Sequence, residues 1–325
     1  HGMTIAYAEN LKRIPDNLLE VQASIMLGVP LLFEAIYKKI MHRIQEKGVL
    51  KFRIGKGLSS FSEKILRKNI RRKVFKPLHE KFGGRLKLLI SGGAAIDPSV
   101  SKGYQDLGLQ CIQGYGLTET SPIITLNRLD NFKFEAAGLP VPGAEFKIED
   151  GEICVKGPMV MKGYYNNKEA TDEVIIDGWF HTGDLGFIDD EGFVHIQGRK
   201  KAVIVTANGK NIYPEEIEEA YSRYAPIEEM CVFEVSTKNG LEESLVLWAV
   251  IVPDLKFFRR FGEINLRAVI KERLDNVSRS LPPHKRIMGF SIRLEELPRT
   301  LLGKIKRFAV KEIYTSKIIE EKGKV

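Results

Sequence analysis

Residues 113–122 read Gln-Gly-Tyr-Gly-Leu-Thr-Glu-Thr-Ser-Pro and follow a short apolar run at 107–112. The run predicts a β-strand, and glycines directly after a strand let the backbone approach a ligand closely. Tyr115 offers a flat apolar ring, while Thr118 and Glu119 offer oxygen atoms, the donors that bind hard cations. The stretch therefore predicts a turn that holds a flat, charged, metal-bound ligand. An ordinary glycine turn with a solvated glutamate is the alternative.

A second candidate turn is built from small residues. The sequence Ser-Gly-Gly-Ala-Ala at 91–95 follows an apolar segment at 85–90, which predicts another strand. Open α/β sheets bind their ligands at the carboxyl ends of their strands. Gly92, Gly93 and Ala94 are therefore candidate ligand-binding residues, with a plain loop as the alternative.

The first third of the chain combines strand and helix patterns. Apolar residues at intervals of three and four after Pro30 predict a helix at 30–44, and a second, basic helix is predicted at 61–81. An apolar run at 4–8 predicts a further strand. Strands that alternate with helices are typical of an α/β domain.

The rest of the chain has a different character. Short alternating segments after 134, separated by Gly, Pro, Asn and Asp, predict a small antiparallel β unit. Later segments alternate between strand and helix again, which predicts a compact α+β domain. We therefore expect an α/β fold in three parts: a partial α/β domain at 1–140, a β-rich subdomain of that larger domain at 141–200, and a mobile α+β domain at 201–325.

Positive charge is concentrated near the start of the chain. Residues 1–90 hold 19 of the 50 Lys+Arg and 7 of the 42 Asp+Glu, a net +12, whereas the remaining 31 and 35 give −4. The densest part, 64–76, predicts an amphipathic helix with a cationic face. A solvated face is the simplest interpretation, and contact with a membrane surface is the next. Nucleic acid is disfavoured, because no aromatic interleaving or binding motif accompanies the charge.

Cysteine use and hydropathy indicate the compartment. The three cysteines, Cys111, Cys154 and Cys231, are far apart, odd in number and match no metal-binding spacing. This pattern favours a reducing cytoplasm without a disulfide framework. No stretch reaches the roughly 18 consecutive apolar residues that a membrane span needs. The sequence therefore predicts a cytoplasmic protein, with peripheral membrane contact as an extension.

Two charged residues stand in distinctive loops. Trp-Phe-His-Thr-Gly-Asp at 179–184 ends in Asp184, whose carboxylate is suited to two vicinal hydroxyls, as of a ribose. The alternative is a turn aspartate that caps its own backbone. Lys304 lies beside a glycine in Pro-Arg-Thr-Leu-Leu-Gly-Lys at 298–304. By itself, an exposed lysine is usually only solvated.

Six motifs occur in one order along the chain. They are Ser-Gly-Gly-Ala at 91–94, Gly-Tyr-Gly-Leu-Thr-Glu-Thr at 114–120, 179–184, Gly-Arg at 198–199, Asn-Gly-Lys-Asn-Ile-Tyr-Pro-Glu-Glu-Ile-Glu at 208–218, and 298–304. The series resembles the adenylate-forming superfamily of acyl-CoA synthetases, adenylation domains and luciferases. Val-Pro-Leu-Leu-Phe-Glu-Ala-Ile-Tyr at 29–37 further resembles the long-chain fatty acyl-CoA synthetase branch, and so does 208–218. Each motif alone is weak, whereas six in this order are specific.

The resemblance implies an AMP-forming ligase that uses ATP, Mg²⁺ and coenzyme A to convert a fatty acid into acyl-CoA through an acyl-adenylate. It implies an adenine site formed by Gly92, Gly93, Ala94 and Tyr115. Gly114 and Gly116, which flank Tyr115 in the same motif, belong to this site. It further implies that Thr118 contacts phosphate and Glu119 holds Mg²⁺, while Asp184 binds the ribose and Arg199 binds ribose or phosphate. Lys304 would be the catalytic lysine and Lys201 the hinge. The pantetheine path would be lined by Asn208, Gly209 and Lys210.

The sequence departs from the family pattern in one important respect. No Ser/Thr/Gly-rich loop with a following lysine is present to cradle the β- and γ-phosphates, and in the family that loop lies upstream of His1. We therefore expect the C-terminal part of a longer synthetase, inactive or weakly active alone. Leu31 stands where the branch often has Arg, and Ala95 where many relatives have Pro. A sister acyl, aryl or carrier-protein ligase, or a non-catalytic membrane- or nucleic-acid-binding module built on 64–76, are the alternatives.

Overall fold

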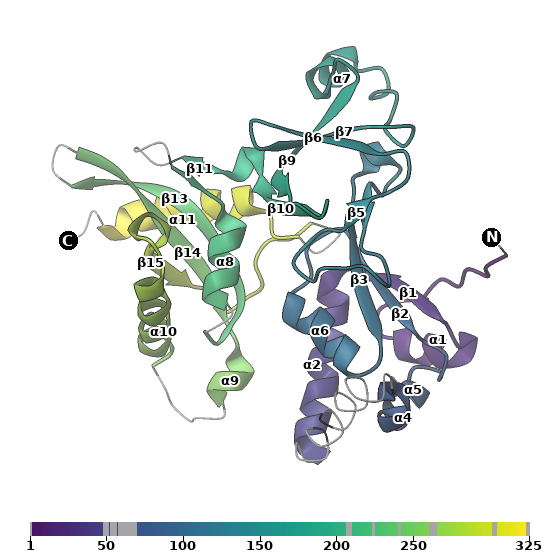
Figure 1. The fold of residues 1–325 in the computed structure, drawn as a ribbon. Helices are drawn as coiled ribbons and strands as arrows, with labels where there is room; N and C mark the ends of the chain where they lie inside the picture. The colour runs from purple at the N-terminus through teal and green to yellow at the C-terminus, as the bar shows by residue number, and fades with distance from the viewer. Residues whose placement is uncertain are drawn as a thin grey trace. The chain divides into compact units, whose positions relative to one another are not determined.

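The structure is a computed structural model. It describes residues 2–47, 52, 57, 70–205, 210–222, 225–239, 242–259, 265–300 and 304–322. The chain divides into two units: unit 1 holds 1–148, 154–182 and 188–195, and unit 2 holds 149–153, 183–187 and 196–325. Helices and sheets alternate along the chain (Figure 1), which confirms the predicted α/β class. The predicted boundaries at 140 and 200 stay predictions.

Unit 1 is organised on a five-stranded sheet with the order β1-β2-β3-β4-β5. Its strands are β1 (Ile25–Gly28), β2 (Leu88–Ser91), β3 (Gln110–Tyr115), β4 (Thr125–Leu126) and β5 (Leu139–Pro140). The first three strands are parallel, so that Ser91 at the end of β2 pairs with Gln113 in β3. Parallel pairing brings the carboxyl ends of β2 and β3 to one edge of the sheet.

Helices cover the sheet of unit 1. They are α1 (Ile14–Val21), α2 (Pro30–Lys47), α4 (Arg71–Val74), α5 (Lys76–Glu80) and α6 (Pro98–Asp106). The helix predicted at 30–44 is confirmed as α2, with Pro30 as its first residue. Phe33 of α2 and Tyr104 of α6 are buried with Leu89 and Cys111 of the sheet, and the Tyr104 hydroxyl donates to the Phe33 carbonyl at 2.6 Å. The core of unit 1 therefore lies between α2, α6 and the sheet.

Two sequence predictions for unit 1 are wrong. Residues 4–8 form no strand, and Ile5 and Tyr7 are exposed, because the apolar run pairs with no described strand. The basic helix does not run unbroken to 81, since α4 and α5 are separated at Phe75. Pro77 stands at the start of α5, where its ring prevents the preceding helix from continuing. Residues 64–69, which carry three of the seven Lys and Arg residues at 64–76, lie outside the described residues.

A second sheet follows in the chain, with the order β10-β9-β7-β6 and with β8 paired to β9. Its strands are β6 (Glu145–Glu149), β7 (Glu152–Lys156), β8 (Ile175–Ile176), β9 (Trp179–Ile188) and β10 (Val194–Arg199), and α7 (Lys168–Val174) precedes β8. The short alternating segments of the sequence correspond to these strands. The sheet confirms the expected β-rich stretch in the middle of the chain.

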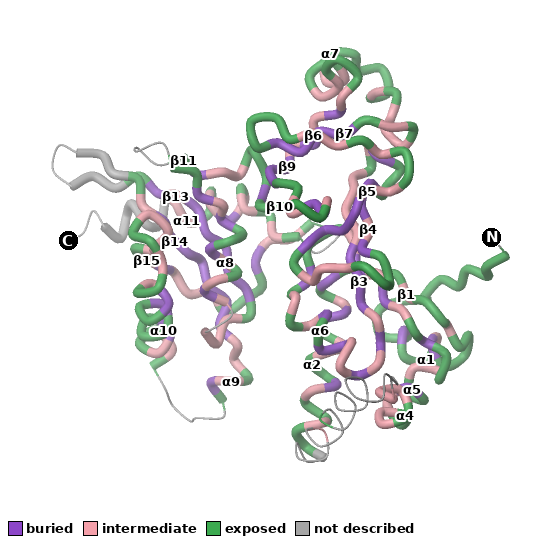
Figure 2. The backbone as a smooth tube through the Cα atoms, viewed as in Figure 1, coloured by how far each residue is buried: buried purple, intermediate pink, exposed green. Residues whose placement is uncertain are grey.

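The C-terminal part of unit 2 contains a three-stranded sheet with the order β13-β14-β15. Its strands and helices are β13 (Ile227–Asn239), β14 (Glu242–Pro253), β15 (Ile287–Ile292), α8 (Pro214–Ser222), α9 (Leu255–Arg259), α10 (Leu266–Ser280) and α11 (Arg307–Lys322), preceded by the pair β11 (Ile204–Val205) and β12 (Asn211–Ile212). Met230 and Val232 of β13 are buried with α8 and α10, whereas Cys231 and Phe233 are buried with Val310 of α11. Both faces of the sheet are therefore covered, and the buried stretches of β13 and β14 are plain in Figure 2.

Asp189 joins the β9–β10 hairpin to a loop of unit 1. Its carboxylate accepts from Lys133 Nζ at 2.7 Å and from the backbone N–H groups of Glu191 and Phe193, and it lies 3.0 Å from His195 Nε2. The Lys133 ammonium, followed by His195, holds the pKa of Asp189 well below its ordinary value. The ionised carboxylate therefore stabilises the fold.

We predict that Asp189→Asn lowers the urea midpoint of unfolding at pH 7. A carboxylate with a lowered folded-state pKa stabilises fully above its unfolded pKa of about 3.9, and this contribution is lost as the pH falls through and below that value. The difference in urea midpoint between Asp189→Asn and the wild type should therefore be smaller at pH 3 than at pH 7. Asp190→Asn, a change at the exposed neighbour, is the control. Equal midpoints for Asp189→Asn and the wild type at pH 7 would contradict this role.

Candidate functional site

The predicted small-residue turn lies at the carboxyl end of β2. Gly92, Gly93 and Ala94 follow Ser91, and Gly93 has a φ of +85°, in the left-handed region that favours glycine. The backbone N–H of Ile96 donates to Oε1 of Gln113 at 3.3 Å, which fastens the end of this turn to β3. Gly92–Ala94 are thereby brought next to the strand that carries Gly114 and Tyr115.

Gln113 is buried and uses its whole amide. Besides accepting from Ile96, its Nε2 donates to the carbonyls of Phe134 at 3.1 Å and Ala136 at 2.8 Å. One side chain thus joins β3, the turn after β2 and the loop before β5. The prediction that the turn begins at Gln113 is corrected, because β3 continues through Gly114 to Tyr115.

The turn of the opening motif begins at Gly116. A Cβ on Gly116 would lie 1.7 Å from the Pro122 carbonyl oxygen, so only glycine permits this close return of the chain. Within the turn, the Thr120 hydroxyl accepts from the Leu117 N–H at 2.9 Å. Thr118 is exposed and Glu119 is half-buried in the short 3₁₀ helix η1 (Thr118–Thr120). The turn therefore presents a hydroxyl and a carboxylate at the end of β3.

The Glu119 carboxylate has a partner in unit 1. Tyr164 donates its hydroxyl to Oε1 of Glu119 at 2.9 Å, and the Met161 N–H donates to the Glu119 carbonyl at 2.7 Å. Carboxylate and hydroxyl oxygens are the donors that Mg²⁺ prefers, so Glu119 and Thr118 fit a magnesium site by chemistry.

Unit 2 pairs the two other predicted nucleotide-binding residues. Arg199 Nε lies 2.8 Å from Oδ1 of Asp184, which is buried although Arg199 is half exposed. Beside them, Glu152 accepts from the Gly183 N–H at 2.8 Å and from Lys200 Nζ at 2.8 Å. Glu152 therefore connects the turn before Asp184 to the residue after Arg199. An aspartate and an arginine at this distance form an ion pair.

Lys304 lies exposed in a hairpin that precedes α11. The Thr300 N–H donates to the Lys304 carbonyl at 2.8 Å, and the Lys306 N–H donates to the Pro298 carbonyl at 2.7 Å. Glu229 holds residues 297–299, the first arm of this hairpin. Its Oε1 lies 2.7 Å from Arg299 Nη2, and its Oε2 accepts from the Leu297 N–H at 2.7 Å. The backbone groups of Thr300, Lys304 and Lys306 are thus hydrogen-bonded, while the Lys304 side chain is exposed.

Arg307 holds the second arm of the same hairpin. Its guanidinium contacts Glu218, lies 2.8 Å from Glu215 Oε1, and donates to the Val232 carbonyl at 2.8 Å. Burial alone would lower the pKa of Arg307, but the carboxylate of Glu218, with that of Glu215, raises it above its ordinary value. The guanidinium is therefore a permanent cation that ties α11 to α8 and β13.

The remaining predicted residues lie elsewhere in unit 2. Lys201 is exposed in the 3₁₀ helix η2 (Lys200–Ala202), and Lys210 is exposed directly before β12. Asn208 and Gly209 lie outside the described residues. The hinge and pantetheine roles stay predictions.

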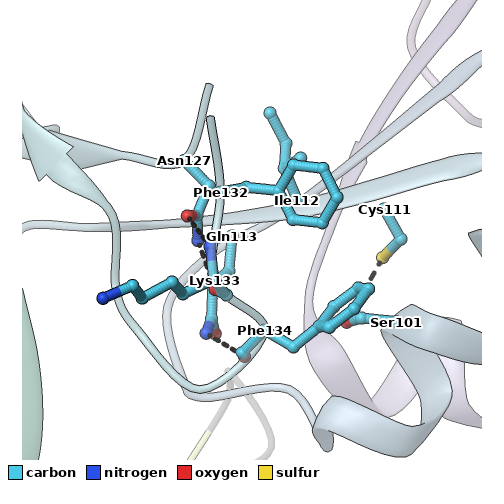
Figure 3. Close-up of a pocket in the computed structure, with 8 residues that line it drawn as sticks. All are labelled: Ser101, Cys111, Ile112, Gln113, Asn127, Phe132, Lys133 and Phe134. Carbon is cyan, nitrogen blue, oxygen red and sulfur yellow. Dashed lines mark hydrogen bonds between the residues drawn. The ribbon is translucent and has the colours of Figure 1, made fainter. Parts of the chain in front are cut away.

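A small cavity in unit 1 is too small for a substrate. Its volume is about 10 Å³, enough for about one water molecule. The lining residues come from α6, β3 and the loop after β4 (Figure 3): Ser101, Cys111, Ile112, Gln113, Asn127, Phe132, Lys133 and Phe134. Burial raises the pKa of Cys111 to about 11, so its thiol is protonated and unreactive here.

The family model described as "AMP-binding enzyme" matches residues 1–165. The chain belongs to the AMP-binding enzyme family. Two curated relatives are long-chain-fatty-acid–CoA ligases. That of Mycobacterium bovis is 33% identical over 234 residues, covering 67% of this chain and 38% of the relative, and that of Bacillus subtilis is 37% identical over 238 residues, covering 68% and 40%. The predicted resemblance to the long-chain branch is thereby confirmed.

A solved structure of the same fold supports this assignment. The chain matches ATP-bound MatB from Rhodopseudomonas palustris with a TM-score of 0.69 and 26% identity, over 94% of this chain and 53% of that one. The fold is therefore that of the adenylate-forming enzymes, as predicted. The chain spans 38–40% of the length of the two curated relatives. Among the described residues, none of the helices has the length and apolar character to cross a membrane.

Sequence analysis missed several residues that support the predicted site residues within each unit. Gln113, Glu152, Tyr164 and Glu229 were not singled out, although each contacts a predicted site residue or its turn. The available signal was a polar residue within or beside an apolar strand pattern, as at Glu152 and Glu229. Buried carboxylates need partners, so such positions indicate an ion pair.

We predict that Glu229→Gln loosens the Lys304 hairpin. The amide can still accept from Leu297, but Arg299 loses its buried carboxylate, which should lower the free energy of unfolding by about 1–3 kcal/mol. Amide hydrogen exchange at 297–306 should become faster. Glu295→Gln is the matched control, because Glu295 is 84% exposed in its pair with Arg293 and should change stability by less than about 0.5 kcal/mol. Unchanged exchange in Glu229→Gln would refute the anchoring role.

Proposed function

We propose that the intact protein is an AMP-forming long-chain fatty acid–CoA ligase. The observation that carries this proposal is the set of six ordered motifs on the adenylate-forming fold, with Thr118 and Glu119 on one turn, Asp184 paired to Arg199, and Lys304 on a fixed hairpin. The curated relatives named above are long-chain ligases, and the MatB structure contains ATP. Substrates are then a fatty acid, ATP and coenzyme A.

In the first half-reaction, a fatty-acid carboxylate oxygen attacks the α-phosphorus of ATP, and the bond to pyrophosphate breaks. Both reactants are anionic, so the barrier depends on cations that offset the charge gathering in the transition state. Lys304 supplies one such cation, bridging the fatty-acid carboxylate and the α-phosphate. Mg²⁺, held by Glu119, would supply the other. Thr118 contacts the phosphates, and Tyr115 with Gly92–Ala94 binds adenine.

In the second half-reaction, the coenzyme A thiolate attacks the acyl carbonyl, and AMP leaves. Lys304 is then no longer needed at the phosphate. A rotation about Lys201 withdraws it and brings the 208–210 segment to the pantetheine, so one site runs both steps. Asp184 and Arg199 keep hold of the ribose throughout. The exposed Lys304 hairpin, rigid at both arms, is suited to delivery as a unit.

For the 325 residues alone we propose little or no ligase activity. This proposal rests on two observations: the chain covers only 38% of the Mycobacterium bovis relative, and its sequence has no triphosphate-binding loop. Binding of AMP is retained in this proposal, because the residues assigned to adenine and ribose are present. We further propose a cytoplasmic protein that touches membrane surfaces through its basic segment, where its substrate partitions.

A sister ligase of the same superfamily is the second candidate. MatB has a different name from the curated relatives yet shares the fold, so the fold does not determine the acid. A panel of medium-chain, long-chain and aryl acids, assayed on the intact protein, separates the candidates. Preference for an aryl or medium-chain acid would replace the long-chain proposal.

We predict that Lys304→Ala in the intact protein lowers the rate of adenylate formation by at least about 100-fold, a scale typical for loss of one transition-state electrostatic contact. Thioester formation from supplied acyl-adenylate should fall far less. Pyrophosphate release and coenzyme A thiol consumption measure the two steps separately.

Lys306→Ala is the matched control, because Lys306 is exposed two residues away on the same hairpin. Its two half-reactions should stay within about twofold of the wild type. Equal losses in both half-reactions for Lys304→Ala would disprove the assigned role.

A further inference from the structure

The Glu119 carboxylate is held on one side only. Tyr164 donates its hydroxyl to Oε1 at 2.9 Å, and it is the one side chain among the described residues that hydrogen-bonds this carboxylate. The same segment also holds the Glu119 backbone through Met161. Both ends of Glu119 are therefore fixed by residues 161–164, which leaves Oε2 for a ligand.

Tyr164 is itself held in a rigid loop. Its N–H donates to the Thr171 hydroxyl at 2.9 Å, and that hydroxyl donates to the Asn167 carbonyl at 2.8 Å. Asn167 caps α7 by accepting from the Ala170 N–H at 3.0 Å. The start of α7 thus fixes the backbone from which Tyr164 reaches Glu119.

Gly163 permits this arrangement. Its φ of +149° is one that other residues rarely adopt, and a Cβ there would lie 2.8 Å from Thr171 Cγ2. The loop can therefore close on α7 only with glycine at this position. A tyrosine presented by such a constrained loop points to a positioning role rather than to incidental surface contact.

We propose that Tyr164 is a positioning residue that makes Glu119 bind a divalent cation through a single oxygen, and so favours Mg²⁺ over Ca²⁺. The inference rests on the proposed role of Glu119 as metal ligand. Mg²⁺ demands near-ideal octahedral geometry with few protein ligands, whereas Ca²⁺ accepts bidentate carboxylates. A hydrogen bond that occupies Oε1 disfavours the bidentate mode.

Hydrogen bonds to ligating carboxylates have measurable effects on metal binding. Losing one typically costs 10–100-fold in affinity or activity. Because Tyr164 is 37% exposed, we expect the lower end of that range. Tyr164→Phe should raise the free Mg²⁺ needed for half-maximal adenylate formation about 10-fold, while the fatty-acid KM and the melting temperature stay unchanged. Ca²⁺ should become a stronger competitor of Mg²⁺.

Tyr165→Phe is the matched control. Tyr165 is the adjacent residue, 94% exposed, and removal of its hydroxyl should leave the Mg²⁺ requirement as in the wild type. The assay uses the intact protein at fixed ATP, with free Mg²⁺ varied and Ca²⁺ added in a second series.

A second readout needs no activity. The Tyr164 hydroxyl lies 2.9 Å from Oε1 of Glu119, so the NMR resonance of this tyrosine reports on the contact. In the 325-residue chain labelled with ¹³Cζ-tyrosine, Glu119→Gln should shift the Tyr164 resonance at pH 7, and this resonance is assigned by its absence in Tyr164→Phe. An unchanged resonance would show that the contact is absent and overturn the inference.

The outcomes separate the inference from the proposed function. If Glu119→Gln raises the Mg²⁺ requirement and Tyr164→Phe does not, the inference is overturned and the role of Glu119 stands. If neither variant changes the Mg²⁺ requirement, Glu119 is not the metal ligand, and both the inference and the proposed role of Glu119 are overturned. A shift in both variants, with a larger Ca²⁺ effect in Tyr164→Phe, supports the inference.

Discussion

The side-chain amide of Gln113 is the interaction on which the unit 1 site depends. It is buried where β2 and β3 end, and from β3 it satisfies three backbone groups, one in the turn after β2 and two in the loop before β5. A buried amide without these partners would cost about 1–3 kcal/mol for each group left unpaired. Because the three segments are tied to one side chain, the turn at Gly92–Ala94 and the turn after Tyr115 keep a fixed separation. The ligand site assigned to them is thereby organised before any ligand binds.

Unit 2 uses buried carboxylates for the same purpose. Glu152 anchors the neighbours of Asp184 and Arg199, and Glu229 anchors the first arm of the Lys304 hairpin. Glu218 anchors Arg307 at the second arm, and burial raises the pKa of Glu218 against the lowering effect of that guanidinium. In each case a carboxylate inside the unit holds a cation or an N–H group near a predicted site residue. This division suits a site whose exposed groups must meet charged substrates while their backbones stay in place.

The sequence predicts the elements whose signal is local. Pro30 and the apolar spacing after it define α2, and Pro214 with the following glutamates defines α8. The strand β13 was not predicted, although it is 13 residues long, because Glu228, Glu229 and Glu234 interrupt its apolar pattern. Those glutamates are explained only by partners far along the chain, as Glu229 is by Arg299 and Glu234 by Lys311.

The candidate site residues are likewise predictable only where their signal is local in the sequence. Motif residues such as Glu119, Asp184 and Lys304 are readable from the sequence because the family motifs mark them. The residues that support them, Gln113, Glu152 and Tyr164, cannot be recognised from the sequence, because they act through contacts that join separate segments. Local spacing also misplaced the turn at Gln113, since strand pairing with β2 and β4 carries β3 on to Tyr115. Tertiary pairing thus decides where the strand ends and the predicted ligand-binding turn begins.

The central claim is that the ends of β2 and β3 together bind the adenylate. Amide hydrogen exchange of the intact protein, with and without a saturating non-hydrolysable acyl-adenylate analogue, tests it most directly. We predict slower exchange at both 92–96 and 114–120 when the analogue binds, because both turns contact the nucleotide. Binding of the analogue with unchanged exchange at both turns would contradict the account.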